Sequence, residues 1–362
     1  MGNKTAPMEF ILKDFSDEPS YETLTFNVLF VIFLSIYLVA LLGNLTIIFV
    51  ITSEGRLQSP MYFLLGHLSF LDLCYISVTV PEILSNFMGR RQIITYSGCV
   101  VQLLFFISME GTEALILAVM AYDRYVAICY PLRYSVIMNR GVCFLLVAAS
   151  WLGGLLNSLV HTILTFSLSF CDTNLKHFFC DIPPLLQASC TQTHVNELVL
   201  FVVGGIWVGF SPFIFIIISY TFIICTVIKI PSTEGRHKAF STCASHLTIV
   251  SLFYGTAIFT YIKPSATYSL QTGSLVSLFY SVATPMFNPI IYSLRNQEIK
   301  KLLKERDLKA IGNGNYDVIS NTGTWLSKSH DWALNVKGCT LYQWDRDIEK
   351  EYLYFYFISY SL

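Results

Sequence analysis

Residues 26–51 read FNVLFVIFLSIYLVALLGNLTIIFVI, a run without a single Asp, Glu, Lys or Arg. About 20 apolar residues are enough for a helix to cross the hydrocarbon core of a membrane. Four further intervals are equally free of charge: 141–171, 198–228, 239–262 and 264–294. Two more apolar stretches carry embedded carboxylates, Asp72 within 57–81 and Glu110 and Glu113 within 92–122. The pattern predicts an all-α membrane protein, a seven-transmembrane helix bundle over residues 26–294.

Composition supports this prediction. The chain of 362 residues is 54% hydrophobic and 13% charged, with a mean hydropathy of +0.57, whereas soluble domains carry about 25% charged residues. With so few charged side chains, the chain has too little polar material to form the surface of a water-soluble protein of this size. A net charge of -1 offers no basic surface for phosphate groups, so no nucleic-acid partner is expected. From the apolar composition, the lipid bilayer is the expected surrounding.

Lys and Arg in the short connections indicate orientation, because cytoplasmic loops carry an excess of them. With residues 1–25 outside, the inner side up to residue 304 holds eleven of these side chains and the outer side holds six. We therefore expect an extracellular N-terminus, in which Asn3-Lys4-Thr5 fits a glycosylation acceptor. The segment before the first span is acidic, so no cleaved signal peptide is expected.

Four of the ten cysteines fall on the predicted outer side: Cys99, Cys171, Cys180 and Cys190. Four cysteines in an oxidising compartment allow three pairings, and spacing alone leaves all three open.

Four sequence motifs indicate a protein family more specifically than the pattern of apolar stretches does. They read PMYFL at 60–64 with LSFLD at 68–72, MAYDRYVAIC at 120–129, KAFSTCASHL at 238–247 and PMFNPIIY at 285–292. Together, over roughly residues 8–306, the chain resembles a vertebrate olfactory receptor of the tetrapod-type class, within the rhodopsin-like G-protein-coupled receptors. The resemblance implies an odorant receptor of the plasma membrane that has no enzymatic activity and no cofactor other than a sodium ion, activates a stimulatory olfactory-type G protein and raises cAMP.

The resemblance also implies roles for individual residues. Cys99 would pair with Cys180 and Cys171 with Cys190, which ties the outer loop over the mouth of the bundle. Residues for G-protein coupling and activation would be Asp123, Arg124, Tyr125, Tyr220, Asn288, Pro289 and Tyr292. Asp123 would restrain Arg124 at rest.

Asp72 and Glu113 are carboxylates within the membrane, which is costly unless they are paired, hydrated or protonated. Similar receptors hold a buried sodium ion near the position of Asp72. The alternative is a hydrogen-bonded pair in which one acid is protonated.

The ligand pocket of such a receptor opens outward between helices three, five, six and seven. Its expected lining is mostly apolar with a few polar groups, as in other small-molecule sites: Phe106, Ile107, Glu110, Gly111, Gly204, Gly205, Val208, Tyr254, Ala257, Ile258, Tyr261, Leu278 and Ser281. Glu110 is not typical of the family. It either contacts the odorant or is a protonated acid that is hydrogen-bonded to a neighbouring helix.

Small residues are expected where helices pack closely: Gly43, Gly66, Gly153, Gly154, Gly204 and Gly205. After the bundle, we expect an amphipathic cytoplasmic helix at 295–306 and a disordered tail at 307–362. The family usually ends near residue 306, so the tail is either specific to a lineage or an artefact of the gene model.

Other functions fit less well. A non-olfactory rhodopsin-like small-molecule receptor is the nearest alternative. A transporter is disfavoured because no internal repeat relates the two halves. An enzyme is disfavoured because the chain has no metalloprotease, nucleophile-elbow or phosphate-loop motif.

Overall fold

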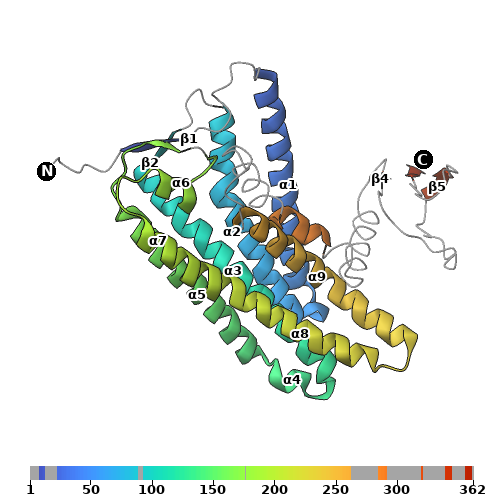
Figure 1. The fold of residues 1–362 in the computed structure, drawn as a ribbon. Coiled ribbons are helices and arrows are strands. Elements are labelled where there is room, and N and C mark those ends of the chain that lie inside the picture. Colours follow the sequence, from blue (N-terminus) through green and yellow to red (C-terminus); the bar gives the residue numbers. More distant parts are fainter. Residues whose placement is uncertain are drawn as a thin grey trace. The chain divides into compact units, whose positions relative to one another are not determined.

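The computed structural model describes residues 8–12, 23–88, 93–175, 177–261 and 284–291, and three short segments at 319–320, 339–344 and 355–360. Contacts divide the chain into two units, Met1–Gln297 and Glu298–Leu362. The first unit contains the predicted bundle (Figure 1).

Helices lie in all seven predicted spans, in the predicted order, and the first six are long. They are α1 (Thr23–Ser53), α2 (Pro60–Met88), α3 (Tyr96–Cys129), α5 (Arg140–Phe166), the continuous helix of α7 (His194–Val199), η3 (Leu200–Phe210) and α8 (Ser211–Ile228), α9 (Thr233–Tyr261), and residues 284–291. Five helices in the described part of the chain are long and apolar enough to cross a membrane. Of the seventh predicted span, only residues 284–291 are described.

Local signals set several helix ends. The side chain of Thr95 accepts a hydrogen bond from the backbone N–H of Gly98 and caps the start of α3. Asn139 caps α5 in the same way through the N–H of Val142. Each cap satisfies one of the N–H groups that a helix leaves unpaired at its start. The connection between α3 and α5 is short, with the 3-10 turn η2 (Pro131–Arg133) and α4 (Tyr134–Ile137).

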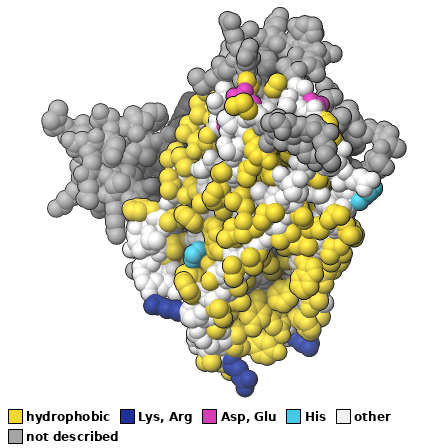
Figure 2. All heavy atoms as spheres, turned by 90° about the vertical axis from the view of Figure 1, so that its left-hand side faces the viewer, with side chains coloured by type: hydrophobic (Ala, Val, Ile, Leu, Met, Phe, Trp, Pro, Cys, Tyr) yellow, Lys and Arg dark blue, Asp and Glu magenta, His cyan; other side chains and the backbone are white. Residues whose placement is uncertain are grey.

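The central helix of the bundle is α3, which contacts α2, α5, α8 and α9. In its most apolar stretch 72% of residues are buried, against 17% in α1 and 11% in the helix from His194 to Ile228. The exposed residues of these outer helices are large and apolar, for example Phe49 and Trp207. Figure 2 shows the resulting broad hydrophobic surface, with Lys and Arg side chains at one end and acidic side chains at the other. Such a surface suits contact with lipid.

Close helix contacts occur at four of the six glycines expected to pack. A Cβ on Gly154 would lie 2.6 Å from the carbonyl oxygen of Ser108, so only glycine allows α5 to approach α3 this closely. Gly43 packs against Pro289, Gly153 against Leu115 and Gly204 against His161. No side chain lies within 4 Å of the Cβ position of Gly205. The packing prediction is therefore wrong for Gly205, whereas Gly66 has an ordinary contact with Ile51 of α1.

A small sheet, which the sequence did not predict, forms at the predicted outer end. Strand β1 (Glu9–Leu12) pairs antiparallel with β2 (Ile93–Thr95) and parallel with β3 (Asn174–Leu175). Phe10 is fully buried in it, with its ring centroid 5.4 Å from that of Phe170 and 6.0 Å from that of Tyr96. The sheet therefore fastens the segment before α1 to two separate loops.

The second unit contains β4 (Ile319–Ser320), β5 (Cys339–Trp344) and β6 (Phe355–Tyr360), which form an antiparallel sheet in the order β4-β6-β5. The expectation of a disordered tail at 307–362 stays a prediction. The predicted amphipathic helix at 295–306 lies outside the described residues, and the predicted region boundaries stay predictions.

Candidate functional site

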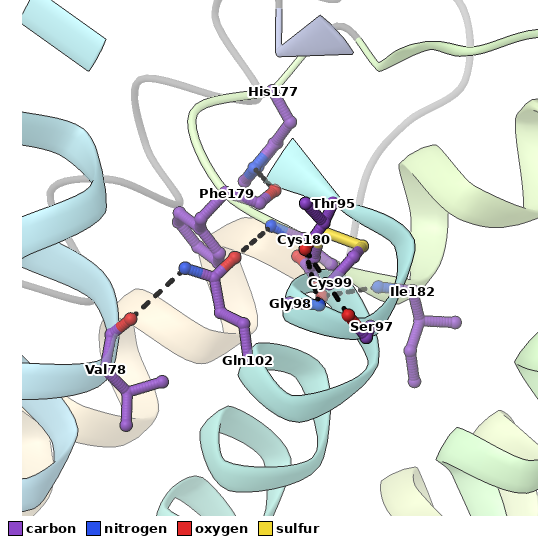
Figure 3. Close-up of a disulfide and its surroundings, with 11 residues drawn as sticks. Val78, Thr95, Ser97, Gly98, Cys99, Gln102, His177, Phe179, Cys180 and Ile182 are labelled. Carbon is purple, nitrogen blue, oxygen red and sulfur yellow. Dashed lines mark hydrogen bonds between the residues drawn. A yellow bond between two sulfur atoms is a disulfide. The ribbon is translucent and has the colours of Figure 1, made fainter. Parts of the chain in front are cut away.

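Two disulfides fix the loop between α5 and α7 (Figure 3 shows the first). Cys99 at the start of α3 is bonded to Cys180, and Cys171 is bonded to Cys190. These are the two pairings that the family resemblance implied. Gln102 extends the first attachment, because its side-chain oxygen accepts from the N–H of Cys180 at 2.8 Å and its amide nitrogen donates to the carbonyl of Val78 in α2.

Phe179, next to Cys180, is the loop residue that reaches the predicted pocket. Its side chain is fully buried, and its ring centroid lies 4.9 Å from that of Phe106. Phe106 also packs against Tyr75 in α2, with ring centroids 5.3 Å apart. The disulfide-bonded loop therefore lies directly over the outermost predicted pocket residue.

The predicted lining residues of α3, and those of α9 whose side chains are described, are buried or partly buried. Phe106, Ile107 and Gly111 are buried, and Glu110 is partly buried. Tyr254 in α9 is buried, with its ring packed against Phe213 of α8. The remaining predicted residue of α9 with a described side chain, Ala257, is partly buried.

On η3, two of the three predicted lining residues face the bundle. Val208 meets Gly111, since a Cβ on that glycine would lie 3.2 Å from a methyl group of Val208. Gly204 faces His161 of α5. Gly205 is exposed, because adjacent helical residues point in different directions, so its place in the predicted lining does not agree with the structure. The side chains of Ile258 and Tyr261, and the whole of Leu278 and Ser281, lie outside the described residues, as does Asn3.

A second polar site lies deeper in the bundle. The side-chain amide of Asn288 donates to both carboxylate oxygens of Asp72, at 2.9 and 3.1 Å. Glu113 interacts with both of these residues. Asn44 of α1 donates to the carbonyl of Pro285 at 3.0 Å and so joins the same region. Asp72, Glu113 and Asn288 are all buried.

The oxygen atoms of this site suit a small hard cation. Within the described ranges, one oxygen each of Glu113, Asn44 and Asn288 is buried without a hydrogen-bond partner. Hard cations prefer carboxylate and amide oxygens of this kind. A group of three or more His, Cys, Asp or Glu side chains able to hold a metal is not found among the described residues, so any cation here would depend on the two acids and the amide oxygens.

At the predicted cytoplasmic end, Arg124 forms an ion pair with Asp123, with 3.0 Å between Nη2 and Oδ2. The hydroxyl of Tyr134, in α4, donates to the other oxygen of Asp123 at 2.6 Å. Burial and the adjacent carboxylate raise the pKa of Tyr134, so this tyrosine stays a neutral donor. Tyr134 was not predicted to belong to the site; its position ten residues after Arg124, in the short connection that follows α3, was the available signal.

A hydrogen-bonded chain next to this ion pair links three helices. The hydroxyl of Tyr220 in α8 is 2.7 Å from Nδ1 of His246 in α9, and Nε2 of His246 is 3.1 Å from the carbonyl oxygen of Leu117 in α3. One ring nitrogen donates and the other accepts. The sequence predicted a role for Tyr220 but assigned none to His246, although a histidine in an apolar helix was a visible signal.

The other predicted coupling residues do not belong to this hydrogen-bonded chain. Tyr125 packs against Phe222 of α8 and its hydroxyl is 3.4 Å from that of Tyr130. Pro289 is buried against Gly43. Tyr292 lies outside the described residues.

Comparisons with known proteins agree with this arrangement. The family model described as olfactory receptor matches residues 33–309. The chain is 51% identical to olfactory receptor 1G1 of the gorilla over 304 residues, which cover 84% of this chain and 96% of the relative. It is 50% identical to human olfactory receptor 5I1, over 82% of this chain and 94% of the relative.

Among solved structures, squid rhodopsin matches with a TM-score of 0.62 at 16% identity, over 85% of this chain and 93% of that one. At this identity the match shows the fold alone, which is the seven-helix bundle. The chain is therefore a member of the olfactory receptor family, a multi-pass receptor of the plasma membrane and not an enzyme.

Proposed function

We propose that this receptor binds small volatile odorants between α3, η3, α9 and the seventh helix, and that it then activates a stimulatory olfactory-type G protein and raises cAMP. The observation that carries the proposal is the polar assembly at the predicted cytoplasmic end. The Asp123–Arg124 ion pair and the chain Tyr220–His246–Leu117 lie on three helices that must separate to admit a partner.

These contacts describe a resting receptor. Arg124 is always charged, yet it is almost fully buried and paired with Asp123, which Tyr134 also holds. His246 keeps α9 against α3 and α8. A ligand shifts an equilibrium between two states only if it binds one of them more tightly. An odorant that binds more tightly when α9 has moved outward would therefore favour breaking the histidine bonds and freeing Arg124.

The pocket is proposed on the buried positions of Phe106, Ile107, Gly111 and Tyr254, under the loop that carries Phe179. Glu110 is proposed to contact the odorant, as a donor to a carbonyl when protonated and as the partner of an amine when charged. Glu110→Gln should then keep responses to carbonyl and alcohol odorants and weaken responses to amines. Glu110→Leu should weaken both, by about 1–3 kcal/mol for an unsatisfied partner. Unchanged half-maximal concentrations for every odorant in both variants would remove Glu110 from the pocket.

A sodium ion is proposed at Asp72 and Glu113. Support comes from the buried oxygens of Glu113, Asn44 and Asn288 that have no hydrogen-bond partner in the described part of the chain. Replacing sodium by choline at constant ionic strength should lower the thermal stability of the purified receptor. Asp72→Asn should abolish this difference, and an equal stability of the unsubstituted receptor in both salts would contradict the proposal.

Two rival functions remain to be tested against odorant reception. A non-olfactory rhodopsin-like receptor would share the cytoplasmic assembly and differ only in ligand. A transporter would need no such assembly, and the identity of about half of the aligned residues to olfactory receptors, over more than four fifths of the chain, argues against it.

The deciding experiment is a cAMP reporter assay on a chemically diverse panel of volatile compounds, with the full chain and with a version that ends at residue 311. We expect a dose-dependent response to some compounds in both. Surface-expressed receptor that responds to none of them, in cells supplied with the olfactory-type G protein, would contradict the proposal.

A further inference from the structure

Strand β1 is the middle strand of the outer sheet, so both of its edges are paired. On one side, Phe10 lies opposite Ile94 of β2. On the other side, the backbone N–H of Ile11 donates to the carbonyl of Thr173 at 2.8 Å, next to β3. Within this sheet β2 and β3 are joined only through β1. The segment before α1 therefore holds together two loops that have no other connection in the sheet.

Buried side chains add to this attachment. Phe10 and Leu12 point to one face of the strand and are 0% and 1% exposed. The ring of Phe10 packs against Tyr96 at the start of α3. The Tyr96 hydroxyl in turn donates to the carbonyl of Phe166 at the end of α5, at 3.3 Å. By contrast Met8, which precedes the strand, is 89% exposed.

The two loops that β1 joins are walls of the proposed pocket. Strand β2 continues directly into α3, and β3 lies in the loop that carries Phe179. Phe179 and its neighbour Phe106 are 0% and 2% exposed. A molecule from the outside therefore reaches Phe106 only if a neighbouring group moves.

The attachments of this loop differ in how they can be released. The bridges Cys99–Cys180 and Cys171–Cys190 are covalent and stay closed in an oxidising compartment. The sheet has strands of four, three and two residues, and strands this few and short have little stability of their own. Among the described attachments, the pairing of β1 is thus one that can separate and form again without a chemical step.

We propose that residues 8–12 form a strap across the outer mouth of the bundle, and that release of the strap from β2 and β3 opens a path from the outside to Phe106. The inference rests on the proposed function, because this path leads to the proposed odorant pocket. It assigns to the segment before α1 a control over how fast a ligand enters and leaves, without a contact to the ligand.

The test measures access to the pocket directly. Ile107→Cys places a thiol at a position that is 6% exposed and next to Phe106. Intact cells that express the full chain with this substitution are treated with a charged, membrane-impermeant methanethiosulfonate reagent. Mass spectrometry then gives the modified fraction at position 107 separately from other cysteines. The rate of modification follows the population of the open form when opening and closing are fast.

A loosened strap should speed the modification. Phe10→Ala, added to Ile107→Cys, should raise the rate by at least about tenfold, because loss of a buried phenylalanine ring strongly destabilises the site that held it. The matched control is Met8→Ala, which shortens an exposed apolar side chain of the same strap and should leave the rate unchanged. Surface expression is measured for every variant.

A locked strap should slow the modification. Ile11 and Ile93 lie opposite each other, and Ile11 donates its N–H toward β3, so the two form a pair without hydrogen bonds. Such pairs have Cα atoms about 4.5 Å apart, which a disulfide can bridge. The double variant Ile11→Cys/Ile93→Cys should lower the rate at position 107 by at least about tenfold relative to each single variant, since the bridge prevents separation. The same lock should slow the decay of cAMP signalling after an odorant is washed out.

Three results would overturn the inference. The first is an equal rate in the locked receptor and in both single variants, which indicates access by another route, for example from the membrane between helices. The second is a lower surface expression of Phe10→Ala with an unchanged rate, which indicates a strand needed only for folding. The third is no modification of position 107 in any variant.

The locked pair decides alone if Phe10→Ala does not reach the cell surface. A failure of the proposed function is distinguishable from a failure of the strap, because the modification needs no odorant. A strap-dependent rate in a receptor that raises cAMP with no odorant would contradict the proposed function and leave the strap in place.

Discussion

His246→Phe should give a receptor that signals without odorant. The phenylalanine ring can keep the stacked contact with Tyr220, whose ring centroid lies 5.7 Å from that of His246. It cannot make the hydrogen bonds to the Tyr220 hydroxyl and to the carbonyl of Leu117. Because both bonds join α9 to its neighbours in the resting receptor, their loss should destabilise that state more than a state with α9 moved outward.

The magnitude follows from the two bonds. Each hydrogen bond contributes about 0.5–1.5 kcal/mol net, so the pair accounts for roughly 1–3 kcal/mol, or a shift of about 5- to 150-fold in the equilibrium. If the active state is populated to about 1% at rest, it would rise to roughly 5–60%. Basal cAMP should increase in proportion, up to the odorant-stimulated level.

The assay compares basal cAMP per surface receptor in the unsubstituted chain, His246→Phe and the control His67→Phe. The control removes another histidine of the bundle, a partly buried side chain of α2 whose ring contacts that of Phe63, and should leave basal cAMP unchanged. Basal cAMP at the unsubstituted level in His246→Phe, with normal surface expression and a normal odorant response, would refute the assignment of these bonds to the resting state.

Arg124→Ala should abolish odorant-evoked cAMP while surface expression persists, and a response of normal amplitude would show that Arg124 does not couple to the G protein. Cys99→Ser should reduce surface receptor more than Cys74→Ser, because only Cys99 is bonded; equal losses, measured by flow cytometry, would argue against a structural need for the bridge. Gly154→Ala should destabilise the purified receptor by roughly 1–3 kcal/mol through overpacking at the α3–α5 contact, whereas Gly55→Ala, with nothing within 4 Å of its Cβ position, should have the same melting temperature as the unsubstituted protein.

The helices were predictable because the membrane imposes a simple requirement. A spanning helix must satisfy every backbone group internally and must present apolar side chains over about 20 residues, so a charge-free interval such as 26–51 is sufficient. Helix ends were less predictable, since helices continue past the apolar stretch. Helix α9 begins at Thr233, where Glu234 and Arg236 are still outside any charge-free interval.

The outer sheet was not predictable from pattern. Its strands have four, three and two residues, which is too short for a recognisable alternation. Their pairing depends on the approach of segments that are far apart in sequence, such as Ile11 and Asn174. The only local signal was a short apolar run, Phe10-Ile11-Leu12, between Glu9 and Lys13.

Site residues that belong to a recognisable motif could be predicted from the sequence. Site residues whose role depends on which way a helix is turned could not. The Asp123–Arg124 pair follows from the motif at 120–129. By contrast, the sequence gives Gly204 and Gly205 the same character, yet only Gly204 faces the bundle, against His161. The rotation of η3 about its axis determines this difference, and η3 is a π-helix, which changes that rotation relative to a regular α-helix.

The distribution of polar groups along α3 connects the outer and inner ends of the receptor. From one end to the other, this helix meets Cys180 through Gln102, Asn288 through Glu113, and His246 through the carbonyl of Leu117. Each contact joins α3 to a different part of the bundle, and each is buried in an environment where an unpaired polar group is costly. A ligand that changes the fit at Gly111, between the first two contacts, therefore acts on the same rigid helix that holds His246. Such a continuous helix gives a physical route by which odorant binding can alter the bonds that keep α9 closed.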